Sequence, residues 1–117
     1  MISPRGITVV LGALGAMQAA AEYVPPQPFT DNAVVVSWKT AKDAKCSANA
    51  GAASVCWVNA CNKVTSTSAP VNLFTPLHEE PLANGHAWVE CTGETSKGNK
   101  YSATEYVRNY EVGFPLA

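Results

Sequence analysis

The sequence has few charged residues and no cluster of one sign. Its 117 residues include 8 Lys and Arg and 9 Asp and Glu, and charged residues make up 15% of the chain. Because the few lysines are scattered, the chain lacks the basic patch that binds nucleic acid or anionic lipid. We therefore expect no nucleic-acid partner. The low charge is also more typical of an exported protein than of a cytosolic one.

The sequence lacks the common signatures of catalytic and metal sites. It has two histidines, and it contains no glycine-rich phosphate loop and no nucleophile motif. Its cysteines do not show the paired C-x2-C spacing of a structural zinc site, and neither histidine is spaced to complete one. We expect no cofactor and no metal, and we favour a protein that is not an enzyme.

A long hydrophobic run is missing as well. One basic residue, Arg5, precedes an uncharged apolar stretch (7–17), and small residues follow it. This order predicts a secretory signal peptide that spans residues 1–21. A membrane anchor needs about 20 apolar residues, whereas residues 7–21 supply fifteen, and Pro25-Pro26 closes the segment soon after them. We therefore expect a secreted, extracellular protein that leaves the membrane after cleavage.

A type IV pilin-like helix is the other interpretation of this segment. Processing at Arg5-Gly6 would make Ile7 the first mature residue. Such proteins usually carry Glu at the fifth mature position, which here is Leu11, and their apolar helix is longer than Pro25 permits. We favour the signal peptide for these two reasons.

The mature chain is the size of one small domain. Removal of residues 1–21 from the 117 leaves 96. Residues 22–32 are rich in proline and aperiodic, which predicts an extended leader. The remaining residues, 33–117, are expected to form a single disulfide-stabilised domain.

Four cysteines in a short exported chain predict two disulfide bonds, for which three pairings are open. Cys56 and Cys61 are five positions apart, which would turn their side chains to opposite faces of a strand. We therefore prefer long-range pairing, as Cys46–Cys56 with Cys61–Cys91. A bridge closing a loop of this size stabilises the fold by about 3–4 kcal/mol on the chain-entropy model.

Short β-branched segments separated by turn signals predict an all-β fold, with at most one short helix. We expect a small disulfide-stapled β-sandwich or barrel of about five to six strands. Turns are predicted at Asn84-Gly85 and Gly98-Asn99, and a loop at 41–53. The predicted strands are 33–40, 54–60, 62–67, 71–75 and 86–92.

The C-terminal segment carries two competing signals. A capping-box pattern at 102–105, Tyr106 and Tyr110 four positions apart, and Gly113 indicate a helix. The strand-forming residues of 101–112 favour a hairpin strand instead. We expect a strand here.

Strand periodicity predicts which side chains form the core. Trp57 is expected to lie outside it, because its strand would turn it away from its neighbours, and exposed aromatics bind sugars or protein partners. Tyr101, which could form a stripe with Tyr106 and Tyr110, is the second candidate binding residue. The predicted buried residues are Val34, Val36, Trp38, Val55, Val58, Val64, Leu73, Trp88 and Val89.

The densest set of functional residue types is His78, with Glu79 and Glu80 after it, followed by His86 and Glu90. An imidazole and a carboxylate together can provide general acid–base catalysis. If the protein is an enzyme, His78, His86 and Glu90 are its candidate catalytic residues. A solvated turn between two prolines is the commoner role of such a segment.

In its inventory of an exported short chain, two histidines and two expected disulfides, the sequence resembles small secreted fungal ribonucleases of the T1 type. The resemblance implies a Glu, two His and an Arg on a sheet, for which the candidates are His78, His86, Glu90 and Arg108. It rests on residue types alone, without an ordered motif.

In its organisation, a signal peptide, a leader and one small domain with two bridges, the chain resembles small secreted cysteine-containing effector-like proteins of filamentous fungi. This resemblance implies a rigid scaffold whose surface loops bind a protein or glycan outside the producing cell. We therefore expect an interaction protein. A small secreted hydrolase or ribonuclease and a cell-wall or carbohydrate-binding module are the alternatives.

Overall fold

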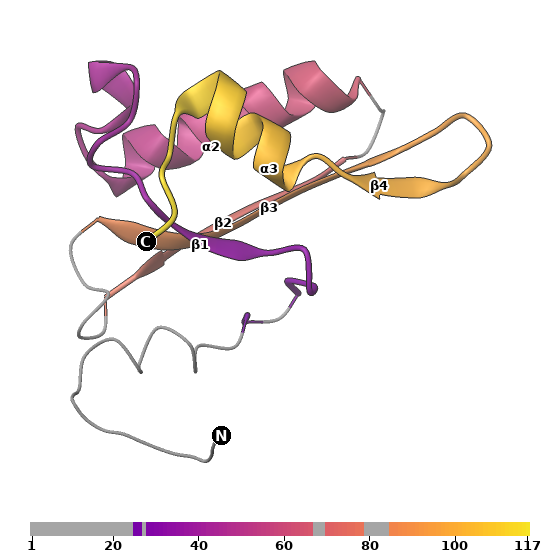
Figure 1. Ribbon diagram of the computed structural model, residues 1–117, viewed down its shortest axis with the longest axis horizontal. Helices are drawn as coiled ribbons and strands as arrows, with labels where there is room; N and C mark the ends of the chain where they lie inside the picture. Colours follow the sequence, from indigo (N-terminus) through magenta and orange to yellow (C-terminus); the bar gives the residue numbers. More distant parts are fainter. Residues whose placement is uncertain (1–24, 27, 67–69, 79–84) are drawn as a thin grey trace, which may run out of the picture.

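The computed structural model describes residues 25–26, 28–66, 70–78 and 85–117, and Figure 1 shows how their helices and strands are arranged. The predicted signal peptide and the first residues of the leader lie outside the described residues. The elements in chain order are β1 (Val34–Ser37), the 3-10 turn η1 (Ala44–Cys46), α2 (Ala50–Thr65), β2 (Val71–Leu77), β3 (His86–Glu94), β4 (Lys100–Ser102), α3 (Thr104–Tyr106) and the π-helical turn η2 (Val107–Val112). No helix in these ranges is long and apolar enough to cross a membrane.

Strand β3 is the centre of an antiparallel sheet. Strand β2 pairs with one edge of β3, in a register that sets Phe74 opposite Val89. Strands β1 and β4 share the other edge, and the β4 register sets Tyr101 opposite Gly93. Covered by strands on both edges, β3 is buried from residue 87 to residue 93.

The helices all lie on one face of this sheet, and the described part of the leader lies on the other (Figure 1). The described chain is therefore a mixed fold, a four-stranded open antiparallel sheet with a helical layer on one side. The predicted antiparallel sheet is present, but the described residues do not form the predicted closed all-β sandwich or barrel. Three of the predicted strands (54–60, 62–67 and 101–112) are mainly helical over their described residues.

Helix α2 replaces two of those predicted strands and the end of the predicted loop. Its N-cap is Asn49, whose side-chain oxygen accepts a hydrogen bond from the Ala52 N–H at 2.8 Å. Three alanines, the strongest helix formers, accompany Gly51 in its first turn. The β-branched valines suggested a strand. However, the buried residues of α2 repeat every four positions, which places them on one helix face. They are Ala53, Trp57, Cys61 and Thr65.

The C-terminal segment is helical, so the strand predicted over 101–112 holds only for its start in β4. The tighter α3 passes into η2, where the Gly113 N–H donates to the Arg108 carbonyl five residues back. Gly113 ends the turn with φ 66°, a left-handed conformation that favours glycine. The helix signals of the sequence were therefore the correct ones.

Both predicted disulfides are confirmed. Cys46–Cys56 fastens η1 to the first half of α2, and Cys61–Cys91 fastens the second half of α2 to β3. The second bond thus ties the helical layer directly to the central strand.

The main core lies between the helices and the sheet, and its centre is Trp57. This side chain is fully buried, its ring stacks on that of Phe114 at 6.2 Å, and its Nε1–H donates to the Glu90 carbonyl at 3.1 Å. The prediction that Trp57 is an exposed binding residue is therefore wrong. Helical rather than strand geometry turns it toward the sheet.

Burial of four predicted core residues is confirmed: Val36, Trp38, Trp88 and Val89. Val55 is 60% exposed, because it lies on the outer side of α2. The others are half-buried: Val34, Val58, Val64 and Leu73.

A smaller core covers part of the second sheet face. Phe29, from the leader, is 5% exposed and packs with Ala33 and Trp88. The backbone N–H of Thr30 donates to the Glu90 carboxylate at 2.8 Å, which fixes the leader to β3. These residues of the proline-rich leader are thus part of the fold.

Candidate binding groove

A groove lies where the end of α2 meets β4 and the C-terminal helical turns. Its volume is about 480 Å³. We call it the tyrosine groove, and its lining residues are Lys63, Val64, Tyr101, Ser102, Ala103, Tyr106 and Glu111.

Tyr101 is held in this groove by a glycine and a hydrogen bond. It lies opposite Gly93, and a Cβ on Gly93 would come within 2.5 Å of the tyrosine ring, so the ring lies directly over the strand. Its hydroxyl donates to the Thr65 carbonyl at the end of α2 at 3.2 Å. The side chain is still 39% exposed. Tyr101, a predicted binding residue, is therefore both fixed and accessible.

Tyr106 lines the groove, and Tyr110 continues the aromatic surface beyond it. Their ring centroids are 5.3 Å apart with an angle of 44° between the planes, and they are 52% and 64% exposed. Aromatic side chains with a hydroxyl are favoured at binding surfaces because they combine apolar area with hydrogen bonding. The stripe of three tyrosines considered in the sequence exists, and it is exposed.

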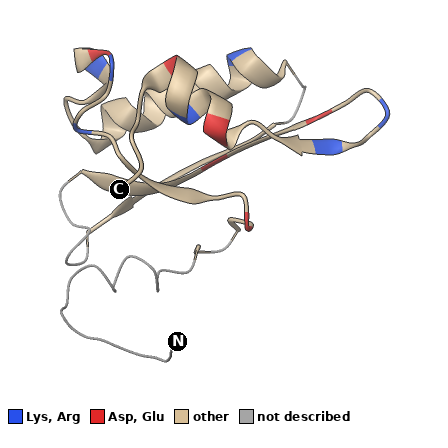
Figure 2. Cartoon of the chain, viewed as in Figure 1, with Lys and Arg blue, Asp and Glu red and all other residues tan. Residues whose placement is uncertain are grey.

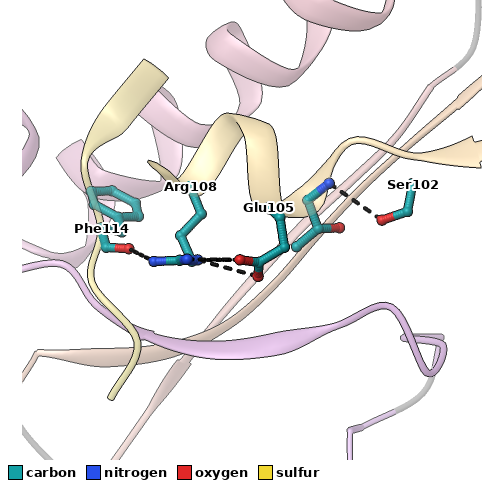
Figure 3. A network of polar contacts seen from close by, with 5 residues as sticks. Ser102, Glu105, Arg108 and Phe114 are labelled. Atoms are coloured by element: carbon teal, nitrogen blue, oxygen red, sulfur yellow. Dashed lines mark hydrogen bonds and ion pairs between the residues drawn. The ribbon is translucent and has the colours of Figure 1, made fainter. Parts of the chain in front are cut away.

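The helical segment that carries these tyrosines is braced from within (Figure 3). The Arg108 guanidinium donates to the Glu105 carboxylate at 2.7 Å and to the Phe114 carbonyl at 3.0 Å. The Arg108 side chain is 12% exposed. Its donors are thus used to connect α3 to the chain after η2.

One ion pair lies at the rim of the tyrosine groove. The Lys63 ammonium is 3.1 Å from the Glu111 carboxylate, with side-chain exposures of 75% and 20%. Surface pairs of this kind contribute about 0–1 kcal/mol, so a ligand can replace either partner at low cost. The two charges cancel, which favours a ligand that is neutral overall.

The residues considered for acid–base catalysis are not brought together. His86 and Glu90 lie on the same face of β3 with Trp88 between them, and four residues of strand span about 13 Å. His78 is exposed beyond the end of β2. Neither imidazole shares a hydrogen bond with Glu90 in the described part of the chain.

The ribonuclease-like set is divided by the sheet itself. Arg108 belongs to the helical layer, whereas Glu90 bonds to the leader on the opposite face. Glu79 and Glu80 lie outside the described residues. The inventory resemblance therefore does not extend to the arrangement of these side chains.

Charges are intermixed over the described elements, and Figure 2 shows no continuous run of basic residues. Within the described ranges no group of three or more His, Cys, Asp or Glu side chains is placed to hold a metal ion. The exposed tyrosines, rather than charge, distinguish the surface.

Comparison of the chain with protein-family models, with curated proteins and with solved structures finds no match. The resemblance to effector-like proteins thus stays a prediction. Any function has to be argued from the geometry of the chain itself.

Proposed function

We propose that this chain is a small secreted binding protein, effector-like in its organisation, that holds a protein partner outside the producing cell at the tyrosine groove. The observation that carries the proposal is the concentration of exposed aromatic surface. Among the described residues six large hydrophobic side chains are exposed, and three of them are Tyr101, Tyr106 and Tyr110. The others are scattered: Val55, Val71 and Leu116.

Preorganisation supports this assignment. A binding surface loses affinity when its side chains and loops become ordered only on binding. Here Tyr101 is held by its bond to Thr65, and the helical segment of Tyr106 is braced by Arg108. The Cys61–Cys91 disulfide ties α2, the helix that supplies Lys63 and Val64 to the groove, to the sheet. Two disulfides also suit an oxidising environment outside the cell.

The angle between the tyrosine rings favours a protein over a flat polysaccharide. A platform for stacked sugar rings needs two coplanar aromatics, whereas Tyr106 and Tyr110 are tilted by 44°. Tyrosine is also among the residue types that contribute most binding energy in protein interfaces. The carbohydrate-binding module is therefore the second candidate.

The test compares variants that truncate similarly exposed hydrophobic side chains in different places. Tyr106→Ala lies in the groove, and Leu116→Ala, a residue exposed to a similar fraction (56% against 52%), is the matched control. Extracellular proteins retained by each immobilised variant are quantified by mass spectrometry. We expect at least one protein to be held by the wild type and by Leu116→Ala, and about ten-fold less by Tyr106→Ala.

Identical retention by all three proteins would contradict the proposal. A glycan array run with the same variants tests the carbohydrate alternative, which predicts sugar binding that Tyr106→Ala abolishes. The enzyme alternative predicts that His78→Ala/His86→Ala abolishes biological activity at an unchanged thermal midpoint. We expect that double variant to stay active.

A further inference from the structure

A second cavity lies on the sheet face that carries the leader, away from the tyrosine groove. It has a volume of about 540 Å³ and is lined by residues of the leader, β2 and β3 and by Lys100 of β4. Its walls include apolar side chains of Pro28, Val71 and Leu73. We call it the leader cavity, and it shares no lining residue with the tyrosine groove.

The floor of the leader cavity holds a buried acid. Glu90 is 1% exposed, and its carboxylate accepts three hydrogen bonds. The Thr30 N–H donates to Oε1 at 2.8 Å, the Thr30 hydroxyl to Oε2 at 2.9 Å, and the Thr92 hydroxyl to Oε2 at 3.0 Å. All three donors are electrically neutral.

Within the described residues this carboxylate forms no ion pair at contact distance. The ion pairs found there are Lys63–Glu111 and Arg108–Glu105, both on the helical side. A buried charge is costly unless a charged partner and hydrogen bonds compensate it. A carboxylate offers about four acceptor positions. Oε1, which accepts one bond where Oε2 accepts two, therefore has room for one more donor.

We propose that the leader cavity binds an organic ammonium: a protonated amine on an apolar chain or ring. The ammonium donates to Glu90 Oε1 and supplies the missing positive charge, while the apolar part lies against Val71 and Leu73. This inference does not depend on the function proposed for the tyrosine groove.

The chemistry of the cavity distinguishes this ligand from a bare metal ion. Calcium needs six to eight oxygen ligands, whereas Glu90, Thr30 and Thr92 supply one carboxylate and two hydroxyls. An ammonium needs few acceptors and gains from apolar walls. Lys100 beside the cavity opposes any cation, and its removal should therefore strengthen binding.

The experiment uses the oxidised mature protein and two probes of equal length, hexylammonium and 1-hexanol. Isothermal titration gives the affinity, and amide shifts in a ¹H–¹⁵N spectrum locate the site. We expect hexylammonium to bind at least ten-fold more tightly than hexanol, with shifts at Thr30, Leu73 and Thr92. Equal affinities, or shifts confined to another face, would overturn the proposal.

Two substitutions of opposite expected effect sharpen the test. Glu90→Gln keeps the size of the side chain and can still bond to both threonines, and we expect it to weaken hexylammonium binding about ten-fold. Lys100→Gln is expected to strengthen binding two- to three-fold at low salt, roughly the scale of a screened surface charge. Lys45→Gln, an exposed lysine on η1, is the control with the same charge change.

If Glu90→Gln does not fold, the comparison of Lys100→Gln with Lys45→Gln tests the proposed site. Stronger binding by Lys100→Gln alone supports the site, and equal affinities of Lys100→Gln and Lys45→Gln refute it. A free amine and a lysine side chain of a partner share this chemistry. N-acetyl-lysine methylamide, titrated in parallel, distinguishes the two sources. A site for a small free amine binds hexylammonium but excludes the bulky amide end of this second probe, whereas a site for a partner's lysine binds both probes.

Discussion

The two faces of the sheet are built by different means. The helical face has a large core centred on Trp57 and Phe114, and both disulfides lie in its helical layer or join that layer to β3. The leader face has a small core of three buried residues, Phe29, Ala33 and Trp88, and is fastened by hydrogen bonds to Glu90. One face is cross-linked, and the other can open without breaking a covalent bond.

The difference indicates where each kind of site belongs. The tyrosine groove lies on the cross-linked side, where a fixed surface can hold a large partner at low entropic cost. The leader cavity lies under a segment held by a small core and a few hydrogen bonds, with no covalent cross-link. Segments with few buried contacts open with a low free energy. Access of a small ligand to Glu90 is consistent with that looser cover.

Two phenylalanines give the largest contrast between the faces. Phe114, fully buried, packs on Trp57, and Phe114→Ala should lower the free energy of unfolding by about 4 kcal/mol. Phe29→Ala should cost about 2 kcal/mol or less, because the leader can detach and leave no cavity. Urea denaturation followed by tryptophan fluorescence measures both. Equal losses would mean that the leader is as integral as the helical core.

The two disulfides differ in the length of chain that they close. Cys61 and Cys91 are 30 positions apart, whereas Cys46 and Cys56 are 10 apart. The chain-entropy model then gives about 3.6 kcal/mol for the longer loop and about 2.7 kcal/mol for the shorter. Paired Cys→Ala variants, compared by thermal and urea unfolding, check this order. A larger loss on removing Cys46–Cys56 would show that η1 contributes more than its loop length.

Two threonines give the smallest contrast. The Thr104 hydroxyl is buried and bonds to both the N–H and the carbonyl of Cys91, at 2.9 and 3.2 Å. Thr104→Val should cost about 2 kcal/mol, because it leaves a buried N–H without an acceptor. Thr30→Val removes one bond to Glu90 at an exposed residue and should cost about 1 kcal/mol. Unfolding curves of the two variants, side by side, decide whether the ranking holds.

Sequence reasoning located the covalent framework and most of the sheet. The disulfide pairing is as predicted, and the strands expected at 71–75 and 86–92 correspond to β2 and β3. Both strands combine β-branched residues with nearby turn signals, which local sequence expresses directly. The pairing of β3 with three neighbours is a tertiary outcome that no local pattern encodes.

Helix α2 was not predicted because its residues fit both the two-residue period of a strand and the 3.6-residue period of a helix. Valines of 54–64 favour a strand by propensity, while the spacing of Trp57 and Cys61 suits a helix face. The helix forms because only helical geometry packs Trp57 against β3. The four-residue spacing from Ala53 to Thr65 was the available signal.

The candidate sites, like the fold, were predictable from the sequence only in part. Exposure of Tyr101 was foreseen, whereas the groove around it requires α2 and η2 to be helices. Glu90 was singled out for acid–base chemistry, yet its partners are Thr30 and Thr92. The interaction of Glu90 with a residue 60 positions earlier depends on where the leader lies, which composition does not specify.

The residues that follow η2 have a consequence for self-association. Pro115 and Ala117 exchange backbone hydrogen bonds with Ser37 and Val35, so they occupy the outer edge of β1. At the opposite edge of the sheet, Pro76 of β2 has no N–H to offer a neighbouring molecule. An uncovered strand edge is a template for pairing with another chain. Deleting 115–117 should therefore leave the tyrosine groove intact but uncover the edge of β1. Molecules of the shortened protein should then pair edge to edge and form fibres on storage.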